Sequence, residues 1–247
     1  MSDYSEILFE RQGRVGLLTL HRPQKRNAFT LQMWEELRHL GDRLLVNPGE
    51  LAVVIVRGSG GVFSSGIVTS LLTTPALSSG TVDVEKIQAA YRWLRQSPFI
   101  TLAAIEKYAI GAGLELALWC DIRLATTGTQ FALPELDFGI IPDLGGCSLL
   151  PEVVGYSRAM ELIVSARRFD ANEAHHMGLI QEVVSPEAWT ARLEYWQQRL
   201  SGLSLSALRG AKQSALASLP DTSRSEQLSR MNMAQCLREA LQRQNPA

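Results

Sequence analysis

The 247-residue sequence is long enough to bury a substantial core as one domain, and its 46% hydrophobic and 20% charged residues are ordinary for a soluble globular protein. A formal net charge of −1 predicts no general attraction to nucleic acid or to an anionic membrane, and no apolar run approaches the ~20 residues of a membrane span. Three cysteines without a metal-binding or paired spacing, and an N-terminus unlike a secretory signal, predict a cytoplasmic protein with no metal site.

The N-terminal part of the chain alternates between strand and helix patterns. Residues 14–20 form a β-rich run, and Thr30 is placed as the N-cap of an amphipathic helix over 31–45. Residues 51–56 form a continuous apolar strand of the kind that is buried on both faces. A glycine-rich turn over 58–66 follows this strand directly.

The middle of the chain continues the alternation. Residues 67–82 are rich in Ser, Thr and Gly and predict a surface loop or lid, whereas 84–96 predict an amphipathic helix. Next come a strand over 100–105, a helix over 113–120, and two short strands over 121–125 and 130–132. The pattern indicates an α/β fold built from repeated strand-strand-helix units.

The C-terminal part of the chain has a different character. From about residue 145 the pattern becomes helical and stays so. We therefore expect a core over residues 1–190 and a C-terminal helical region over 191–247, packed together because no low-complexity linker separates them.

Two glycine-containing turns could supply hydrogen-bond donors to a reaction. Gly111-Ala112-Gly113 follows a strand and opens a helix, and 63–67 follows a buried strand. Backbone N–H groups at a helix start are unpaired and carry partial positive charge, which suits a developing oxyanion. The other interpretations are a tight packing turn, a plain loop and, for the first turn, a dinucleotide-binding motif that lacks its third glycine.

Carboxylates near these turns are candidate acids and bases. Glu115 lies in the first turn of an otherwise apolar helix, and Glu135 follows Pro134 between apolar runs. The two could serve as general base and general acid beside a polarised carbonyl. Alternatively, Glu115 is a favourable charge at a helix N-terminus and Glu135 is a solvated loop acid. Asp143 is a third acid or a turn residue before two glycines.

A resemblance to a known family rests on segments in a fixed order, namely HRPQKRNAF, VFSSG, LAAIEKYAIGAGLELALWCDIRLA, FALPELDFGIIPDLGG, ANEAHHMGLIQEVV and SALRGAK. Over nearly its whole length the chain resembles the crotonase (enoyl-CoA hydratase/isomerase) family. The resemblance implies a spiral of ββα units with a C-terminal helical region that assembles trimers or dimers of trimers. It also implies a role in fatty acid metabolism on an acyl thioester of coenzyme A or an acyl-carrier protein, with no cofactor beyond the coenzyme A of the substrate.

The resemblance also implies roles for individual residues. The amides of Ile67 and Ala112 match the family's oxyanion-hole donors, and Glu115 and Glu135 match the two catalytic glutamates of enoyl-CoA hydratases. Having both glutamates favours hydration of an α,β double bond. Asp143 matches a catalytic aspartate of the dienoyl-CoA and ring-opening isomerase branches, so a double-bond isomerase that uses Glu135 and Asp143 is the alternative hypothesis.

The coenzyme A portion would lie along two segments near the central turn. The positions matched are Arg26, Ala28, Ser64, Ser65, Gly66, Val68 and Gly111. The sequence departs from the family at three places: Ala112 replaces a glycine, Val68 replaces a common aspartate, and Glu106-Lys107 replaces an Asn-Gly pair. The departures at Val68 and Lys107 motivate a third hypothesis, a non-catalytic acyl-thioester binding protein.

Overall fold

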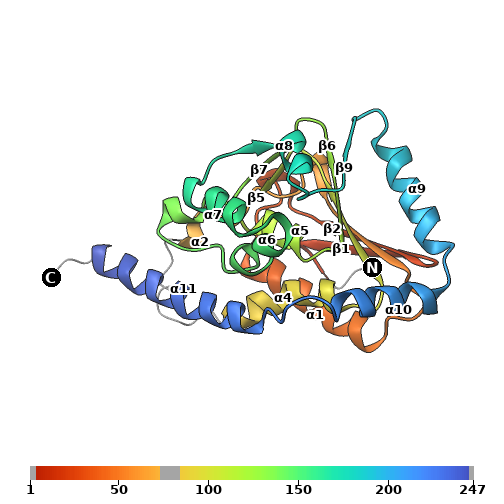
Figure 1. Cartoon of the computed structure of the whole chain (residues 1–247), viewed down its shortest axis with the longest axis horizontal. Coiled ribbons are helices and arrows are strands. Elements are labelled where there is room, and N and C mark those ends of the chain that lie inside the picture. Colours follow the sequence, from red (N-terminus) through yellow and green to blue (C-terminus); the bar gives the residue numbers. More distant parts are fainter. Residues whose placement is uncertain (1–3, 73–83, 245–247) are drawn as a thin grey trace.

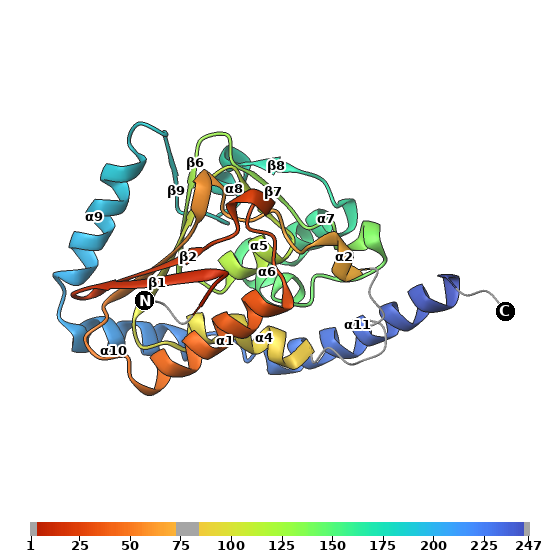
Figure 2. The ribbon, with the colours of Figure 1, turned by 180° about the vertical axis from the view of Figure 1, so that it is seen from behind.

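The computed structural model describes residues 4–72 and 84–244 and has a mixed α/β fold built on one large sheet (Figures 1 and 2). The order of its six strands is β1-β2-β3-β4-β6-β9. Among the described strands of this sheet, only the β1–β2 pair is antiparallel. The strands are β1 (Ile7–Gln12), β2 (Val15–Leu20), β3 (Val53–Gly58), β4 (Ile100–Ile105), β6 (Ile122–Thr126) and β9 (Glu182–Val184).

A second, smaller sheet shows how the repeated units are built. Its order is β5-β7-β8, with β5 (Tyr108–Ile110), β7 (Gln130–Ala132) and β8 (Phe169–Asp170). In one unit β4 joins the large sheet, β5 joins the small sheet, and α5 (Ala112–Leu118) follows. In the next unit β6 and β7 do the same before η3 (Glu135–Phe138) and α6 (Gly146–Val154). This strand-strand-helix repeat is the predicted spiral.

Helices cover both faces of the large sheet, which explains the unbroken apolar run of β3. Val54 and Val56 pack in the larger core, together with side chains of α1 (Leu31–Val46), α4 (Val84–Gln96) and α5. Val53 and Ile55 point to the opposite face, where they meet α9 (Trp189–Ser201) and α10 (Leu205–Leu216). Alternate residues of a strand face opposite sides, so a strand between two helical layers must be apolar throughout.

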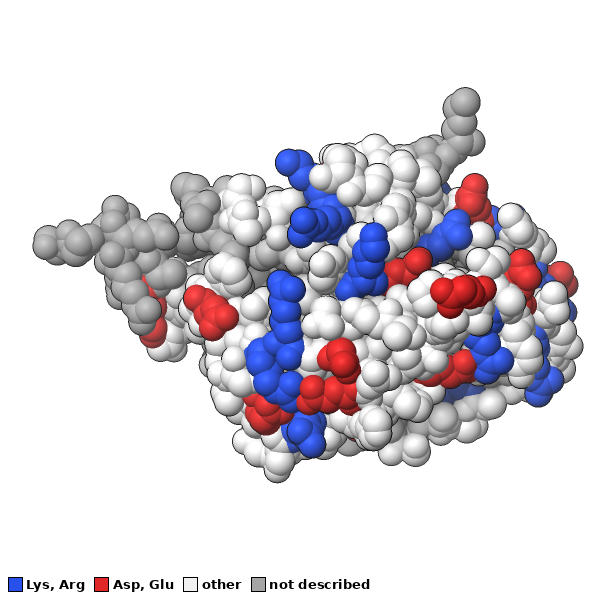
Figure 3. Space-filling model, turned by 90° about the horizontal axis from the view of Figure 1, so that it is seen from above, with Lys and Arg blue, Asp and Glu red and all other residues white. Residues whose placement is uncertain are grey.

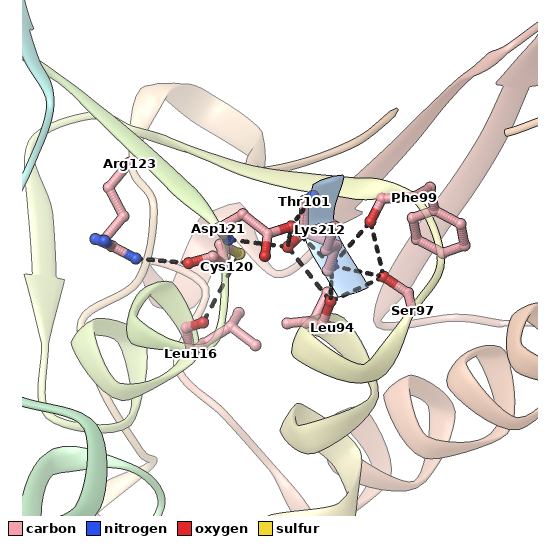
Figure 4. A network of polar contacts seen from close by, with 9 residues as sticks. All are labelled: Leu94, Ser97, Phe99, Thr101, Leu116, Cys120, Asp121, Arg123 and Lys212. Carbon is pink, nitrogen blue, oxygen red and sulfur yellow. Dashed lines mark hydrogen bonds and ion pairs between the residues drawn. The ribbon is translucent and has the colours of Figure 1, made fainter. Parts of the chain in front are cut away.

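A buried lysine fixes α10 against the end of the sheet. Lys212 Nζ donates to the backbone oxygens of Leu94 and Phe99 at 3.1 and 2.8 Å, and to the Ser97 hydroxyl at 3.3 Å (Figure 4). It also pairs with Asp121 Oδ2 at 2.8 Å. A buried ammonium group must be paired and hydrogen-bonded. The SALRGAK segment therefore contributes a structural contact.

The N-terminal part also contains two 3₁₀ helices and one short α-helix, namely η1 (Pro23–Lys25), η2 (Ser59–Gly61) and α2 (Thr69–Leu72). The C-terminal part is completed by α7 (Tyr156–Ser165), α8 (Ala171–His176) and α11 (Ser223–Gln244). The start of α11 lies beside α4, and its far end extends past the rest of the molecule (Figures 1 and 2). Across the described ranges, no helix combines the length and apolarity needed to cross a bilayer. Basic and acidic side chains are interspersed over the face in Figure 3, in keeping with the near-zero net charge.

Several sequence-based expectations need correction. The chain beyond residue 145 is not wholly helical, because β8 pairs with β7 and β9 extends the large sheet beside β6. These strands are two and three residues long, too short for an alternating pattern to show. The expected loop over 67–82 begins with α2, and residues 73–83 lie outside the described part of the chain. Thr30 does cap α1, accepting from Met33 N at 3.1 Å.

Candidate active site

A cavity of about 340 Å³ lies where the central turn, η3, α4 and α11 meet. Its walls are mainly apolar, from Trp34 on α1, Ile87 on α4, and Met233 and Leu237 on α11, among others. Three buried carboxylic acids, Glu115, Glu135 and Asp143, and the exposed Asp137 line the same space. An apolar cavity with a few convergent polar groups is the usual form of a small-molecule site.

Glu115 is held by the start of α6. Its side chain extends from α5 and is 2% exposed, and Oε1 accepts hydrogen bonds from Leu144 N at 2.8 Å and Gly146 N at 3.0 Å. Burial raises the pKa of Glu115 well above its usual range, repulsion from Glu135 and Asp143 adds to the rise, and the two amides oppose it. The carboxyl is thus fixed in position by two backbone amides, while its burial favours the protonated form.

The Glu135 carboxyl has fewer hydrogen-bond donors around it than the Glu115 carboxyl. It opens η3 and is 8% exposed, and within the described part of the chain its Oε2 has no hydrogen-bond partner. Burial raises the pKa of Glu135 to about 7, with a further contribution from Asp143. Its carboxyl lies against the central turn, since a Cβ on Gly111 would come within 2.7 Å of Glu135 Oε1. Gly111 has φ +51° and ψ −125°, so glycine is required there for both reasons.

Asp143 is the third acid. It is 7% exposed, and its Oδ2 lacks a partner among the residues that the structure describes. Burial raises its pKa to about 7, and the positive charge of Arg230 on α11 opposes the rise. All three acids chosen from the sequence therefore lie in one cavity, although they are far apart along the chain.

Two residues that line this cavity have backbone amides for which the described ranges of the protein supply no acceptor. Ala112 is the first residue of α5, where a helix leaves its N–H groups unpaired. Ile67 bridges Phe29 in parallel, but the bonds of that bridge use Gly66 O and Val68 N. The N–H of Ile67 therefore points to the other side of its extended segment, and both residues line the cavity. Two backbone N–H donors from separate segments can together stabilise one oxyanion.

The residues matched to coenzyme A binding fall into two groups. Ser65, Gly66 and Gly111 line the cavity. Arg26, Ala28, Ser64 and Val68 do not line it: Arg26 is exposed, Ala28 and Ser64 are buried behind the turn, and Val68 donates its amide to Phe29 O at 3.0 Å. The Ser64 hydroxyl donates to Asn27 O at 2.9 Å and accepts from Gly66 N at 3.2 Å, so it shapes the turn.

Sequence reasoning placed Asn27 only in the segment along coenzyme A and gave Gln88 no role, so it missed how both side chains support the site. Asn27 is buried with φ +53°, and its Nδ2 donates to Ser59 O at 3.0 Å and Val62 O at 2.6 Å. These bonds tie the HRPQKRNAF segment to the glycine-rich turn. Gln88 on α4 donates to Asp143 O at 2.7 Å. The available signal was a glutamine on the apolar face of an amphipathic helix, next to Ile87 and one turn before Tyr91.

Comparison with known proteins identifies the family. The model of the enoyl-CoA hydratase/isomerase family matches residues 10–244. The chain belongs to this family. Like its relatives, this enoyl-CoA hydratase/isomerase family member is an enzyme. Mycobacterium leprae has a "Probable enoyl-CoA hydratase" that is 34% identical over 223 residues, 89% of this chain and 84% of that protein.

Other relatives of this family member extend the comparison. A candidate enoyl-CoA hydratase of Thermobifida fusca, solved with acetoacetyl-CoA, is 33% identical with a TM-score of 0.81, covering 92% of this chain and 94% of that one. Pseudomonas aeruginosa DspI is 29% identical with a TM-score of 0.80, covering 94% and 96%. A peroxisomal Δ(3,5)-Δ(2,4)-dienoyl-CoA isomerase of Arabidopsis thaliana is 35% identical over 178 residues, 67% of this chain and 64% of that protein. Hydratases and isomerases are thus both among its relatives.

Proposed function

We propose that this enzyme is an enoyl-CoA hydratase that adds water reversibly across the α,β double bond of an acyl-CoA thioester. The observation that carries the proposal is the meeting of two buried glutamates, Glu115 and Glu135, with two unpaired backbone amides in one apolar cavity. The complex of the Thermobifida relative with acetoacetyl-CoA supports coenzyme A as the carrier. Assembly as trimers or dimers of trimers through residues 191–247 is part of the same proposal.

In the proposed reaction the thioester carbonyl accepts from the amides of Ile67 and Ala112, which stabilise negative charge on its oxygen. Removing one such donor typically slows an enzyme about 10²–10³-fold. Glu115, ionised, takes a proton from water as the water oxygen bonds to Cβ and the π bond breaks. Glu135, protonated, delivers its proton to Cα. The carboxyls exchange charge states, and proton transfer after product release restores them.

Hydrogen bonding supports this assignment of base and acid. Two amides of the α6 start donate to Glu115 Oε1 and favour its ionised form, against the burial that raises its pKa. The Oε2 of Glu135 has no donor within the described ranges, so no hydrogen bond stabilises a negative charge on that oxygen. Carboxyls in one buried cavity cannot all ionise at neutral pH, because each charge raises the pKa of the others.

A panel of enoyl thioesters, followed by loss of conjugated-enone absorbance, tests the proposal. We expect turnover by the wild type and a loss of at least ~10²-fold in Glu135→Gln, since general acid–base catalysis contributes about that much. A folded Glu135→Gln variant with near-wild-type hydration would exclude the two-glutamate scheme. For a non-catalytic binding protein, deuterium from solvent would not enter Cα of a saturated thioester.

Double-bond isomerisation is the second candidate, and Asp143 is the observation that favours it. Its Oδ2 has no hydrogen-bond partner among the described residues, and Asp143 lines the same cavity as Glu135, so two carboxyls could remove and return protons at separate carbons. We expect Asp143→Asn to leave hydration of a 2-enoyl thioester largely intact. Abolished migration of a 3,5-dienoyl thioester in that variant, with hydration spared, would favour the isomerase.

A further inference from the structure

Gln88 joins the C-terminal helix to the loop that carries Asp143. Its side chain is 1% exposed; Nε2 donates to Asp143 O at 2.7 Å, and Oε1 accepts from Arg230 Nη1 at 2.6 Å. Arginine only donates and a carbonyl only accepts, so the two partners leave one orientation for the amide. The proposed reaction gives Gln88 and Arg230 no role, although they lie directly behind the site.

The carbonyl held by Gln88 belongs to the same peptide group as an amide that holds Glu115. That group links Asp143 to Leu144, and Leu144 N donates to Glu115 Oε1 at 2.8 Å. No cis peptide bond occurs in the described part of the chain, and the C=O and N–H of a trans peptide point in opposite directions. One planar unit is therefore held by Gln88 at one end and by Glu115 at the other. It cannot rotate without breaking both bonds.

All donors in this series point the same way, from a guanidinium to a carboxylate. Arg230 donates to Gln88, Gln88 to the 143–144 peptide group, and that group to Glu115. Consecutive hydrogen bonds polarise one another, and the dipoles of the Gln88 amide and of the 143–144 peptide group both favour negative charge on Glu115 Oε1. We propose that Gln88 and Arg230 are positioning residues that hold the 143–144 peptide group, and through it the Glu115 carboxylate, in the geometry that activates water. The inference rests on the proposed function.

The same two helices carry a matched control. Arg92 Nε and Nη2 donate to Glu226 Oε2 at 3.0 and 2.7 Å, joining α4 to α11 a second time. Gln88 and Arg92 are four residues apart on α4, and Glu226 and Arg230 are four apart on α11. The two links therefore occupy adjacent turns of one helix pair. Only the link through Gln88 continues to the 143–144 peptide group.

Kinetics of Gln88→Leu, Arg230→Met and Arg92→Met test the inference on the enoyl thioester that the wild type turns over fastest. Gln88→Leu releases the peptide group whose Leu144 amide donates to the Glu115 carboxylate. A hydrogen bond to a charged group is worth about 10- to 100-fold in rate, so we expect kcat to fall by that factor in Gln88→Leu with KM within about threefold. Arg230→Met should lower kcat in the same direction by less. Arg92→Met should retain kcat within about twofold while its melting temperature falls.

Amide hydrogen exchange of the full-length protein gives a readout that does not need turnover. Gln88→Leu should expose the Leu144 amide, so exchange in the segment 141–149 should accelerate about tenfold, whereas Arg92→Met should leave it unchanged. Equal losses of kcat and of protection in the two variants would overturn the inference. If Gln88→Leu does not fold, the kcat of Arg230→Met and its amide exchange in segment 141–149, each compared with Arg92→Met, decide whether the inference holds. A wild type that hydrates no thioester refutes the proposed function, while the exchange data still decide whether Gln88 holds the peptide group.

Discussion

The buried Glu135 carboxyl should make the protein less stable as pH rises. Burial and Asp143 raise its pKa from 4.5 to about 7 in the folded protein. Below pH 4.5 the group is neutral in both the folded and the unfolded state and costs nothing. Between 4.5 and about 7 the folded state binds more protons, so the free energy of unfolding falls with pH. Above about pH 7 the free energy of unfolding falls no further on account of this group. The difference between a pKa of 4.5 and one of about 7 corresponds to roughly 3 kcal/mol.

Glu135→Gln removes this effect because glutamine does not titrate. Relative to wild type, the variant should gain up to roughly 3 kcal/mol on going from about pH 5 to about pH 8.5. Urea unfolding followed by tryptophan fluorescence at these two pH values, at equal protein concentration, measures the difference. Asp137→Asn is the matched control, since it removes an exposed carboxyl of the same 3₁₀ helix. Equal pH dependence of wild type and Glu135→Gln would refute the reasoning.

Three further predictions concern other positions. Gly111→Ala should abolish turnover, because the residue has φ +51° and its new Cβ would lie 2.7 Å from Glu135 Oε1, an oxygen of the proposed acid; steady-state assays measure this. Lys107→Gly should raise the free energy of unfolding by roughly 0.5–1 kcal/mol, because Lys107 has φ +57°, a conformation that costs a side chain about 1–2 kcal/mol. Lys212→Met should cost roughly 3–5 kcal/mol in urea unfolding, since it leaves Asp121 without its buried partner.

Each of these predictions has a result that contradicts it. Gly128→Ala introduces strain at φ +83° with no atom within 4 Å, so it should lower stability and spare kcat; equal kcat losses in the two alanine variants would show that the Gly111 effect is backbone strain alone. Lys107→Ala separates conformation from charge, and a gain equal to that of Lys107→Gly would exclude the backbone explanation. A Lys212→Met loss below about 1 kcal/mol would show that the ion pair is replaceable.

Local sequence patterns determined much of the fold and the chemical groups of the site. The apolar run of β3, the Thr30 cap of α1 and the strand-turn-helix around Gly111 follow from side-chain period and glycine conformation, which depend on neighbours in sequence. Glu115 and Glu135 stood out because an acid is costly between apolar runs unless it is paired or functional. The structure confirms the β3 strand, the Thr30 cap and the turn at Gly111, and it places Glu115 and Glu135 as buried residues of one cavity.

Only the tertiary structure decided which of these groups meet, and which other residues hold them. β8 and β9 form because they pair with the edges of the longer strands β7 and β6. Their own residues therefore show little sequence pattern typical of a strand. The link from Arg230 through Gln88 to the 143–144 peptide group joins three segments that are distant in sequence. Its partners are fixed by how α11 packs on α4, because a buried polar group takes the partner that folding brings to it. The acids of the site could thus be predicted from the sequence, but the contact between the 143–144 peptide group and Glu115 could be seen only in the folded structure.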